Sequence, residues 1–249
     1  MVALDFTFLQ VRNEACPMAH VLRELKVQAV PEKGASGEVS ALLLRPDRAG
    51  HLLVLAHGAS THMRHRTLQT IADRLADAGI ATFRYNFPYM EHGRGRDAPD
   101  ICTATVRAAV AAARGAAGDL PLLAGGHSFG GRMTSTASSE SPLDGVLGLV
   151  FFAFPLHQPG RPDTKRADHL SRVRLPMLFL SGTRDELARL DLLQGVCAGL
   201  GERATLCLLD TADHGFRALK RSRSTPEDVF VEMARRVSEW ATSGVLPAS

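Results

Sequence analysis

The pentapeptide Gly126-His127-Ser128-Phe129-Gly130 is the feature that most constrains how this chain can fold. It follows the apolar run 121–125 and precedes a helix-compatible stretch that begins at Gly131. A G-x-S-x-G motif between a strand and a helix indicates a sharp, strained turn that exposes the serine hydroxyl. Side chains on either side of that turn would collide, which explains the glycines. The motif predicts that Ser128 is a nucleophile; otherwise the serine merely caps the next helix.

A nucleophilic serine needs a base, and the base needs an acid that orients it. Asp185 follows the apolar stretch 177–182, and His214 follows the apolar stretch 204–209. Both residues therefore occur where a predicted strand ends, in the chain order serine, acid, histidine that this type of turn favours. The carboxyl ends of parallel strands are also where ligands bind in open α/β sheets. We expect Ser128, Asp185 and His214 to form a triad.

Other carboxylates remain open as the acid. Glu186 comes one residue late, and Asp210 and Asp213 lie very close to His214 along the chain. An acid can also follow the preceding strand, but the predicted strand 146–154 continues into Pro155-Leu156-His157-Gln158 without a carboxylate. Asp185 is the preferred candidate.

Acyl transfer further requires two backbone N–H groups that face the developing negative charge. One should belong to Phe129, directly after the nucleophile. The other should come from the loop His57-Gly58-Ala59-Ser60 after the predicted strand 51–56, where glycine allows a close backbone approach. Ala59 is favoured over Ser60 as this second donor.

Cationic side chains occur in three loops that should line the site, 59–66, 88–100 and 157–166. Arg64, Arg66 and His157 are the candidates for contacts with an acyl group that bears carboxylate or phosphate. The alternative is a solvated basic surface, with nearby acids as local partners. His57, His62 and His65 lack metal-ligand spacing, so no metal and no cofactor are expected.

Together with His57-Gly58, Asp185 and His214, the serine motif resembles the α/β-hydrolase superfamily. The string Arg84-Tyr85-Asn86-Phe87-Pro88-Tyr89 also resembles the R-x-N-F-P-Y segment of small, uncapped, dienelactone-hydrolase-like members, the KANL/Tex-like hydrolases. The resemblance spans about residues 22 to 240. It implies an α/β-hydrolase fold, although dienelactone hydrolases proper carry cysteine where this chain has Ser128.

Strand and helix patterns alternate along the chain. They predict an α/β fold with an eight-stranded, mostly parallel sheet and helices on both faces. Strands are expected near 24–30, 39–44, 52–56, 80–86, 121–125, 146–154, 177–181 and 204–209. Helices are expected near 67–78, from Pro99 to about 118, after the serine motif, near 186–200 and from 225 onward, where residues 229, 230, 233, 237 and 240 should be buried. The segment 155–175 is too short for a cap domain and should hold at most one short helix.

One domain, residues 21–243, is expected between a loosely held extension, 1–20, and a tail, 244–249. The net charge of +3 is too small to predict a nucleic-acid partner. Cys16, Cys102, Cys197 and Cys207 show no C-x-x-C spacing and predict reduced thiols. No signal peptide and no membrane span are apparent, so a cytoplasmic location is expected.

These features predict a serine hydrolase that acts on a carboxylester or thioester of a small molecule through an acyl-enzyme. The alternative is a catalytically silent binding or scaffold protein of the same fold. The sequence leaves the acyl group, the alcohol and the oligomeric state open.

Overall fold

The computed structural model describes residues 20–29 and 37–246, and within them eight strands form one sheet. Their order across the sheet is β1-β2-β4-β3-β5-β6-β7-β8. The pairs β1–β2 and β2–β4 are antiparallel, and every later pair is parallel. The predicted eight-stranded, mostly parallel sheet is confirmed. The strand bounds are β1 His20–Gln28, β2 Glu38–Pro46, β3 His51–Ala56, β4 Ile80–Tyr85, β5 Leu122–His127, β6 Val146–Phe152, β7 Met177–Gly182 and β8 Ala204–Leu209.

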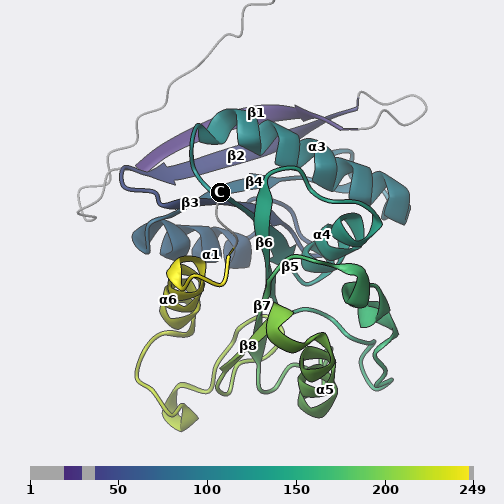
Figure 1. Ribbon diagram of the computed structural model, residues 1–249, viewed down its shortest axis with the longest axis vertical. Coiled ribbons are helices and arrows are strands. Elements are labelled where there is room, and N and C mark those ends of the chain that lie inside the picture. Colours follow the sequence, from purple (N-terminus) through teal and green to yellow (C-terminus); the bar gives the residue numbers. More distant parts are fainter. Residues whose placement is uncertain (1–19, 30–36, 247–249) are drawn as a thin grey trace, which may run out of the picture.

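Helices cover both faces of the sheet, as parallel strands require of their crossover connections. Figure 1 shows α1 and α6 on one face and α3, α4 and α5 on the other. The bounds of these helices are α1 Arg66–Asp77, α3 Pro99–Ala117, α4 Phe129–Glu140, α5 Leu190–Leu200 and α6 Val229–Thr242. The four-residue helix α2, Pro88–Glu91, was not predicted from the sequence.

The core is divided by the sheet into two layers, and β3 shows how. Leu52 and Val54 belong to the buried cluster on the side of α3, α4 and α5. Leu53 and Leu55 point the other way and belong to the cluster formed with α1 and α6. Successive strand residues face opposite sides, so a strand covered on both faces is apolar throughout. This explains the uninterrupted apolar runs of the central strands.

The helix α5 begins at Leu190, later than the predicted start near Glu186. The carbonyl oxygen of Leu187 accepts hydrogen bonds from the backbone amides of Leu156, at 2.8 Å, and His157, at 3.1 Å. Because this backbone pairs with the segment after β6, it does not enter the helical hydrogen-bond pattern. A tertiary contact therefore delays the helix by one turn.

The last helix begins at Val229, later than the predicted start at residue 225, because the carboxylate of Asp228 caps it there by accepting from the amide of Phe230 at 2.9 Å. Four of the five side chains predicted to be buried along this helix are buried, and Phe230 is only partly covered. Between β6 and β7 the only helix is the short 3₁₀ helix η1, Lys165–Arg172, so this segment forms no large cap over the sheet.

Predictions for residues 1–19, Val30, the turn 31–36 and the tail residues 247–249 lie outside the described residues. The limits of the single domain therefore stay predictions. Where the chain is described, none of its helices combines the length and the apolar character needed to cross a membrane.

Candidate active site

Ser128 lies between β5 and α4 in a backbone conformation that side chains rarely adopt, with φ 50° and ψ −116°. Neighbouring glycines make this turn possible. A Cβ atom on Gly126 would lie 2.7 Å from the carbonyl carbon of Gly130, and one on Gly130 would lie 2.6 Å from the carbonyl carbon of Ala56. Contacts this short are not tolerated, so the close approach of the turn to β3 excludes any larger residue. The predicted strained turn is present.

A continuous chain of hydrogen bonds joins Ser128, His214 and Asp185. The Nε2 atom of His214 lies 2.8 Å from Oγ of Ser128, and its Nδ1 atom lies 2.9 Å from each carboxylate oxygen of Asp185. A carboxylate only accepts hydrogen bonds, so Nδ1 carries the proton and Nε2 is free to accept the serine proton. These three residues follow β5, β8 and β7, whose carboxyl ends meet at one edge of the sheet.

The environment of Asp185 holds its carboxylate in place. Its side chain is fully buried, and Oδ1 also accepts from the amide of Leu187 at 2.8 Å. The other acids considered from the sequence are engaged elsewhere or exposed. Asp213 accepts from two amides of its own loop, Asp210 accepts from the amide of Ser224, and Glu186 is exposed. The structure thus brings Asp185, and none of these three, to His214.

His127, inside the serine motif, connects the turn to the loop of His214. Its Nε2 atom donates to the backbone carbonyl oxygen of His214 at 3.2 Å, and the two rings lie 5.6 Å apart between centroids. Burial lowers the pKa of His127 to about 4, so its ring is neutral at neutral pH. Because the His127 ring is neutral, no second positive charge lies beside His214 when His214 accepts the serine proton.

The loop after β3 is held by His57, which is fully buried. Its Nε2 atom accepts from the amide of Phe87 at 3.0 Å, so Nδ1 carries the proton and donates to the carbonyl oxygen of Gly58 at 2.7 Å. Burial lowers the pKa of His57 to about 4. Thr61 also donates to this carbonyl oxygen, through its amide and its hydroxyl, each at 3.2 Å.

These bonds orient the peptide unit between Gly58 and Ala59. In a planar trans peptide the C=O and N–H groups point in opposite directions, and the described chain has no cis peptide bond. The Ala59 N–H group therefore points away from His57 and Thr61. Among the described residues, the amides of Ala59, Ser60 and Phe129 have no backbone acceptor. All three remain available as oxyanion donors, and their role stays a prediction.

The R-x-N-F-P-Y segment is the part of the chain that clamps this loop. Asn86 accepts from the amide of Met63 at 2.9 Å, and Arg84 donates to the carbonyl oxygen of the same residue at 3.2 Å. The hydroxyl of Tyr89 donates to the carbonyl oxygen of Ala59 at 3.0 Å. With the amide of Phe87, which donates to His57, four of the five defined positions of the motif contact the loop. In the sequence this string shows only a resemblance, and no local pattern in it indicates contacts with the loop after β3.

Arg64, Arg66 and His157 form no hydrogen bond or ion pair with the triad in the described residues, and a role for them in substrate contact stays a prediction. Arg64 forms an ion pair with Glu24 of β1 at 2.7 Å, and Arg66 is exposed at the start of α1. His157 is 3% exposed, with Nδ1 donating to the carbonyl oxygen of Gln158 and Nε2 accepting from the amide of Arg189. Both ring nitrogens are thus engaged, and the ring helps to hold the loop after Asp185.

The described part of the chain contains no group of three or more histidine, cysteine, aspartate or glutamate side chains that could hold a metal ion. Cys102 and Cys197 are buried, and burial raises the pKa of their thiols to about 12 and about 11. Such thiols stay protonated and are poor nucleophiles at neutral pH.

Comparison with known proteins identifies the family and the fold of this chain. Residues 49–242 match the sequence profile of a family described as an alpha/beta hydrolase domain. This match covers most of the sheet and all of the residues discussed for the triad and the loop after β3.

Solved structures share the fold over almost their whole length. A dienelactone hydrolase from Anabaena variabilis is 18% identical, with a TM-score of 0.66 over 90% of this chain and 98% of that one. An α/β serine hydrolase without a lid from Xanthomonas campestris is 20% identical, with a TM-score of 0.66 over 92% and 96%. An esterase domain from Rhodothermus marinus is 17% identical, with a TM-score of 0.65 over 90% and 99%. At these identities the similarity concerns the fold.

Proposed function

Because this chain belongs to the alpha/beta hydrolase domain family, we propose that it is a serine hydrolase that cleaves a carboxylester of a small molecule. A thioester is the second choice of scissile bond and an amide the third. Ser128 is the proposed nucleophile, His214 the base and Asp185 the acid that orients it. The observation that carries the proposal is the unbroken chain of hydrogen bonds from Ser128 Oγ through the His214 ring to Asp185.

In the first step, Nε2 of His214 takes the proton of the Ser128 hydroxyl as Oγ attacks the carbonyl carbon of the ester. The carbonyl oxygen becomes negatively charged and is stabilised by the amides of Phe129 and Ala59. The buried carboxylate of Asp185 stabilises the imidazolium that forms. Collapse of this intermediate breaks the bond to the alcohol, which leaves with the proton from His214, and an acyl-enzyme remains.

In the second step, His214 takes a proton from a water molecule, and the resulting hydroxide attacks the acyl carbon. The ester bond to Ser128 breaks, Oγ regains the proton from His214, and the carboxylic acid is released. No cofactor takes part. The absence of a large cap supports access of small esters to Ser128 from solvent.

A fluorophosphonate probe tests this proposal, because it reacts with a serine only when a neighbouring base activates the hydroxyl. The wild-type protein should be labelled and Ser128→Ala should not. In Ser128→Ala, the rate of p-nitrophenyl acetate hydrolysis should fall by about 10⁴- to 10⁶-fold.

Ser135 provides a matched control. Its Oγ atom lies 2.7 Å from Nε2 of His169, but it is buried within α4 and also donates to the carbonyl oxygen of Arg132. Ser135→Ala should keep the label. Equal labelling of wild type and Ser128→Ala would refute the assignment and favour the alternative, a catalytically silent binding protein of this fold.

A further inference from the structure

Two guanidinium groups contact the ring of Phe129, the residue that directly follows the proposed nucleophile. The Cζ atom of Arg96 lies 5.1 Å from the ring centroid, and that of Arg132 lies 5.7 Å from it. Arg132 is one helical turn after Ser128, and its amide donates to the Ser128 carbonyl oxygen at 3.2 Å. Helical side chains lean toward the N-terminus, so this guanidinium reaches back toward the catalytic end of α4.

Arg166, from the segment after β6, is the third cation of this cluster. Its Nη1 atom donates to the carbonyl oxygen of His157 at 2.9 Å. Burial lowers the pKa of Arg132 most, and the charges of Arg166 and Arg96 lower it further. The guanidinium of Arg132 is therefore close enough to those of Arg166 and Arg96 to be repelled by each, which costs free energy unless an anion binds beside Arg132.

Acidic side chains of the described residues do not form ion pairs with this cluster. Within residues 20–29 and 37–246, no carboxylate forms an ion pair with Arg96, Arg132 or Arg166. Asp97 and Asp100 lie in the same region, since both act on the thiol of Cys102 together with Arg96 and Arg132.

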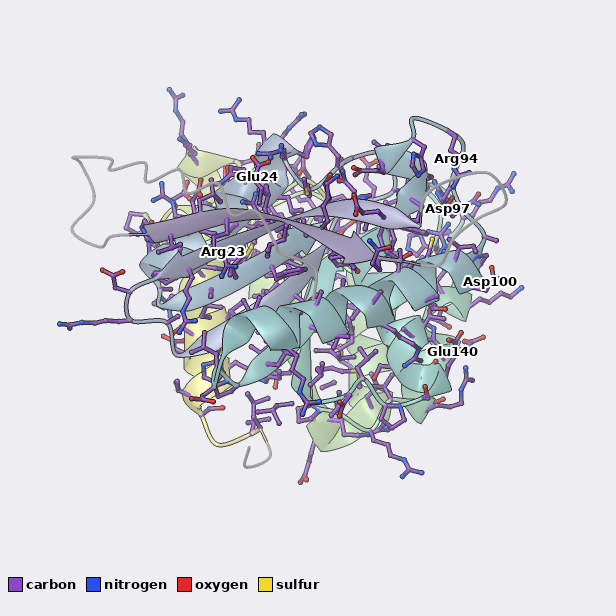
Figure 2. All side chains as sticks on the ribbon, turned by 90° about the horizontal axis from the view of Figure 1, so that it is seen from above. Arg23, Glu24, Arg94, Asp97, Asp100 and Glu140 are labelled. Carbon is purple, nitrogen blue, oxygen red and sulfur yellow. The ribbon has the colours of Figure 1, made fainter. Side chains whose placement is uncertain are left out.

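Asp97, however, already has partners. Its carboxylate accepts from the amide of Tyr89 at 2.8 Å and lies 3.6 Å from the guanidinium of Arg94. Figure 2 shows Arg94, Asp97 and Asp100 together at one end of the molecule, well apart from Glu24, the partner of Arg64. Arg96 and Arg132 lie at Phe129, whereas Arg64 forms an ion pair with Glu24.

We propose that Arg96, Arg132 and Arg166 form an anion-binding subsite, so that the ester substrate carries a carboxylate or phosphate group on the side that lies over Phe129. This inference rests on the proposed serine hydrolase function. Guanidinium groups bind carboxylate and phosphate oxygens through paired hydrogen bonds, and partial burial strengthens such bonds. The three arginines come from the segments after β4, β5 and β6, so an anion held by them lies beside the turn that bears Ser128.

A substrate series tests the subsite by kinetics. We would compare kcat/KM for p-nitrophenyl acetate, mono-p-nitrophenyl succinate and the p-nitrophenyl ester of 3-phosphonopropionate. In Arg96→Met and Arg132→Met, the preference for either anionic ester over acetate should fall by about 10- to 100-fold, the scale of a hydrogen bond to a charged group. The anionic ester whose preference over acetate falls more identifies the group, carboxylate or phosphate, that the subsite binds. The double variant Arg64→Met/Arg66→Met removes two charges elsewhere and should keep the wild-type preference.

Binding without turnover separates this inference from the proposed function. Calorimetric titration with succinate and with inorganic phosphate should show saturable binding to wild-type protein and to Ser128→Ala, weakened in Arg96→Met. Arg96 is exposed, so this variant should fold even if Arg132→Met does not. Unchanged ester preference and unchanged anion binding in Arg96→Met would overturn the subsite, whereas fluorophosphonate labelling of Ser128 would still stand. If the wild-type protein binds the anions but is not labelled by fluorophosphonate, only the proposed hydrolase function is overturned.

Discussion

The hydroxyl of Tyr89 donates a hydrogen bond of 3.0 Å to the backbone carbonyl oxygen of Ala59, thirty residues earlier in the chain. This bond fixes the peptide unit between Ala59 and Ser60, just as His57 and Thr61 fix the preceding unit through the carbonyl oxygen of Gly58. The N–H groups of Ala59 and Ser60 are therefore both oriented by hydrogen bonds to the carbonyl oxygen of the same peptide unit, which points the opposite way. Preorganised donors of this kind stabilise a transition state without reorganising during the reaction.

Removal of the Tyr89 hydroxyl should consequently slow catalysis. Tyr89→Phe should lower kcat by roughly 10- to 100-fold, because small displacements of catalytic groups have effects of this size, while KM should change much less. Tyr85→Phe is the matched control, since the Tyr85 hydroxyl is buried without a hydrogen-bond partner in the described residues. Steady-state kinetics of both variants decide the matter, and an equal loss in Tyr85→Phe would contradict the positioning role.

Replacement of the acid should separate tautomer control from stability. Asp185→Asn should lower kcat by roughly 10⁴-fold, because asparagine favours the wrong tautomer of His214. The matched change Asp213→Asn should have little effect, since its side-chain oxygen can still accept from the amides of Gly215 and Arg217. If Asp213→Asn proves the more damaging variant in ester hydrolysis, the acid has been assigned incorrectly.

Acidification should destabilise the fold through its buried neutral histidines. The folded-state pKa of His57 is about 4, below its ordinary value of 6.5, so between these values the unfolded chain binds a proton that the folded chain does not. The free energy of unfolding should then fall as pH drops from 6.5 toward 4, by up to about 1.4 kcal/mol per pH unit for this residue. Lowered pKa values of His127 and His169 act in the same direction.

Urea denaturation between pH 4.5 and 7 measures this dependence. His57→Gln should unfold more easily at neutral pH but show a shallower slope of stability against pH. The exposed residue His92 gives the control, and His92→Gln should retain the wild-type slope. An identical slope in His57→Gln would show that the buried ring does not contribute.

Glycine substitutions should have opposite effects at the turn and in a surface helix. Gly130→Ala should prevent formation of the turn, because its Cβ would lie 2.6 Å from backbone atoms of β3. Gly195 lies in α5 with no atom within 4 Å of an added Cβ, so Gly195→Ala should stabilise the protein by about 0.5–1 kcal/mol. Thermal unfolding of the two purified variants checks both directions, and a stable, active Gly130→Ala protein would argue against the strained turn.

The sequence by itself was sufficient for the features that depend on local sterics and periodicity. The glycines around Ser128, the apolar strands and the apolar face of the last helix are each defined by a few neighbouring residues. Because parallel strands end at a common edge, the order of the strands was enough to place Ser128, Asp185 and His214 near one another. The eight-stranded sheet and the absence of a large cap followed from the same patterns.

Only the tertiary structure distinguished residues that look alike in the sequence. Asp185 and Asp213 both follow the end of a strand, yet Asp185 is buried against His214 whereas Asp213 closes its own turn. Arg64 and Arg96 both lie in cationic loops, but Arg64 pairs with Glu24 whereas Arg96 packs on Phe129. These outcomes depend on contacts between segments distant in the chain, whose side-chain directions and partners are set when the sheet and its loops pack together. No local pattern carries that information.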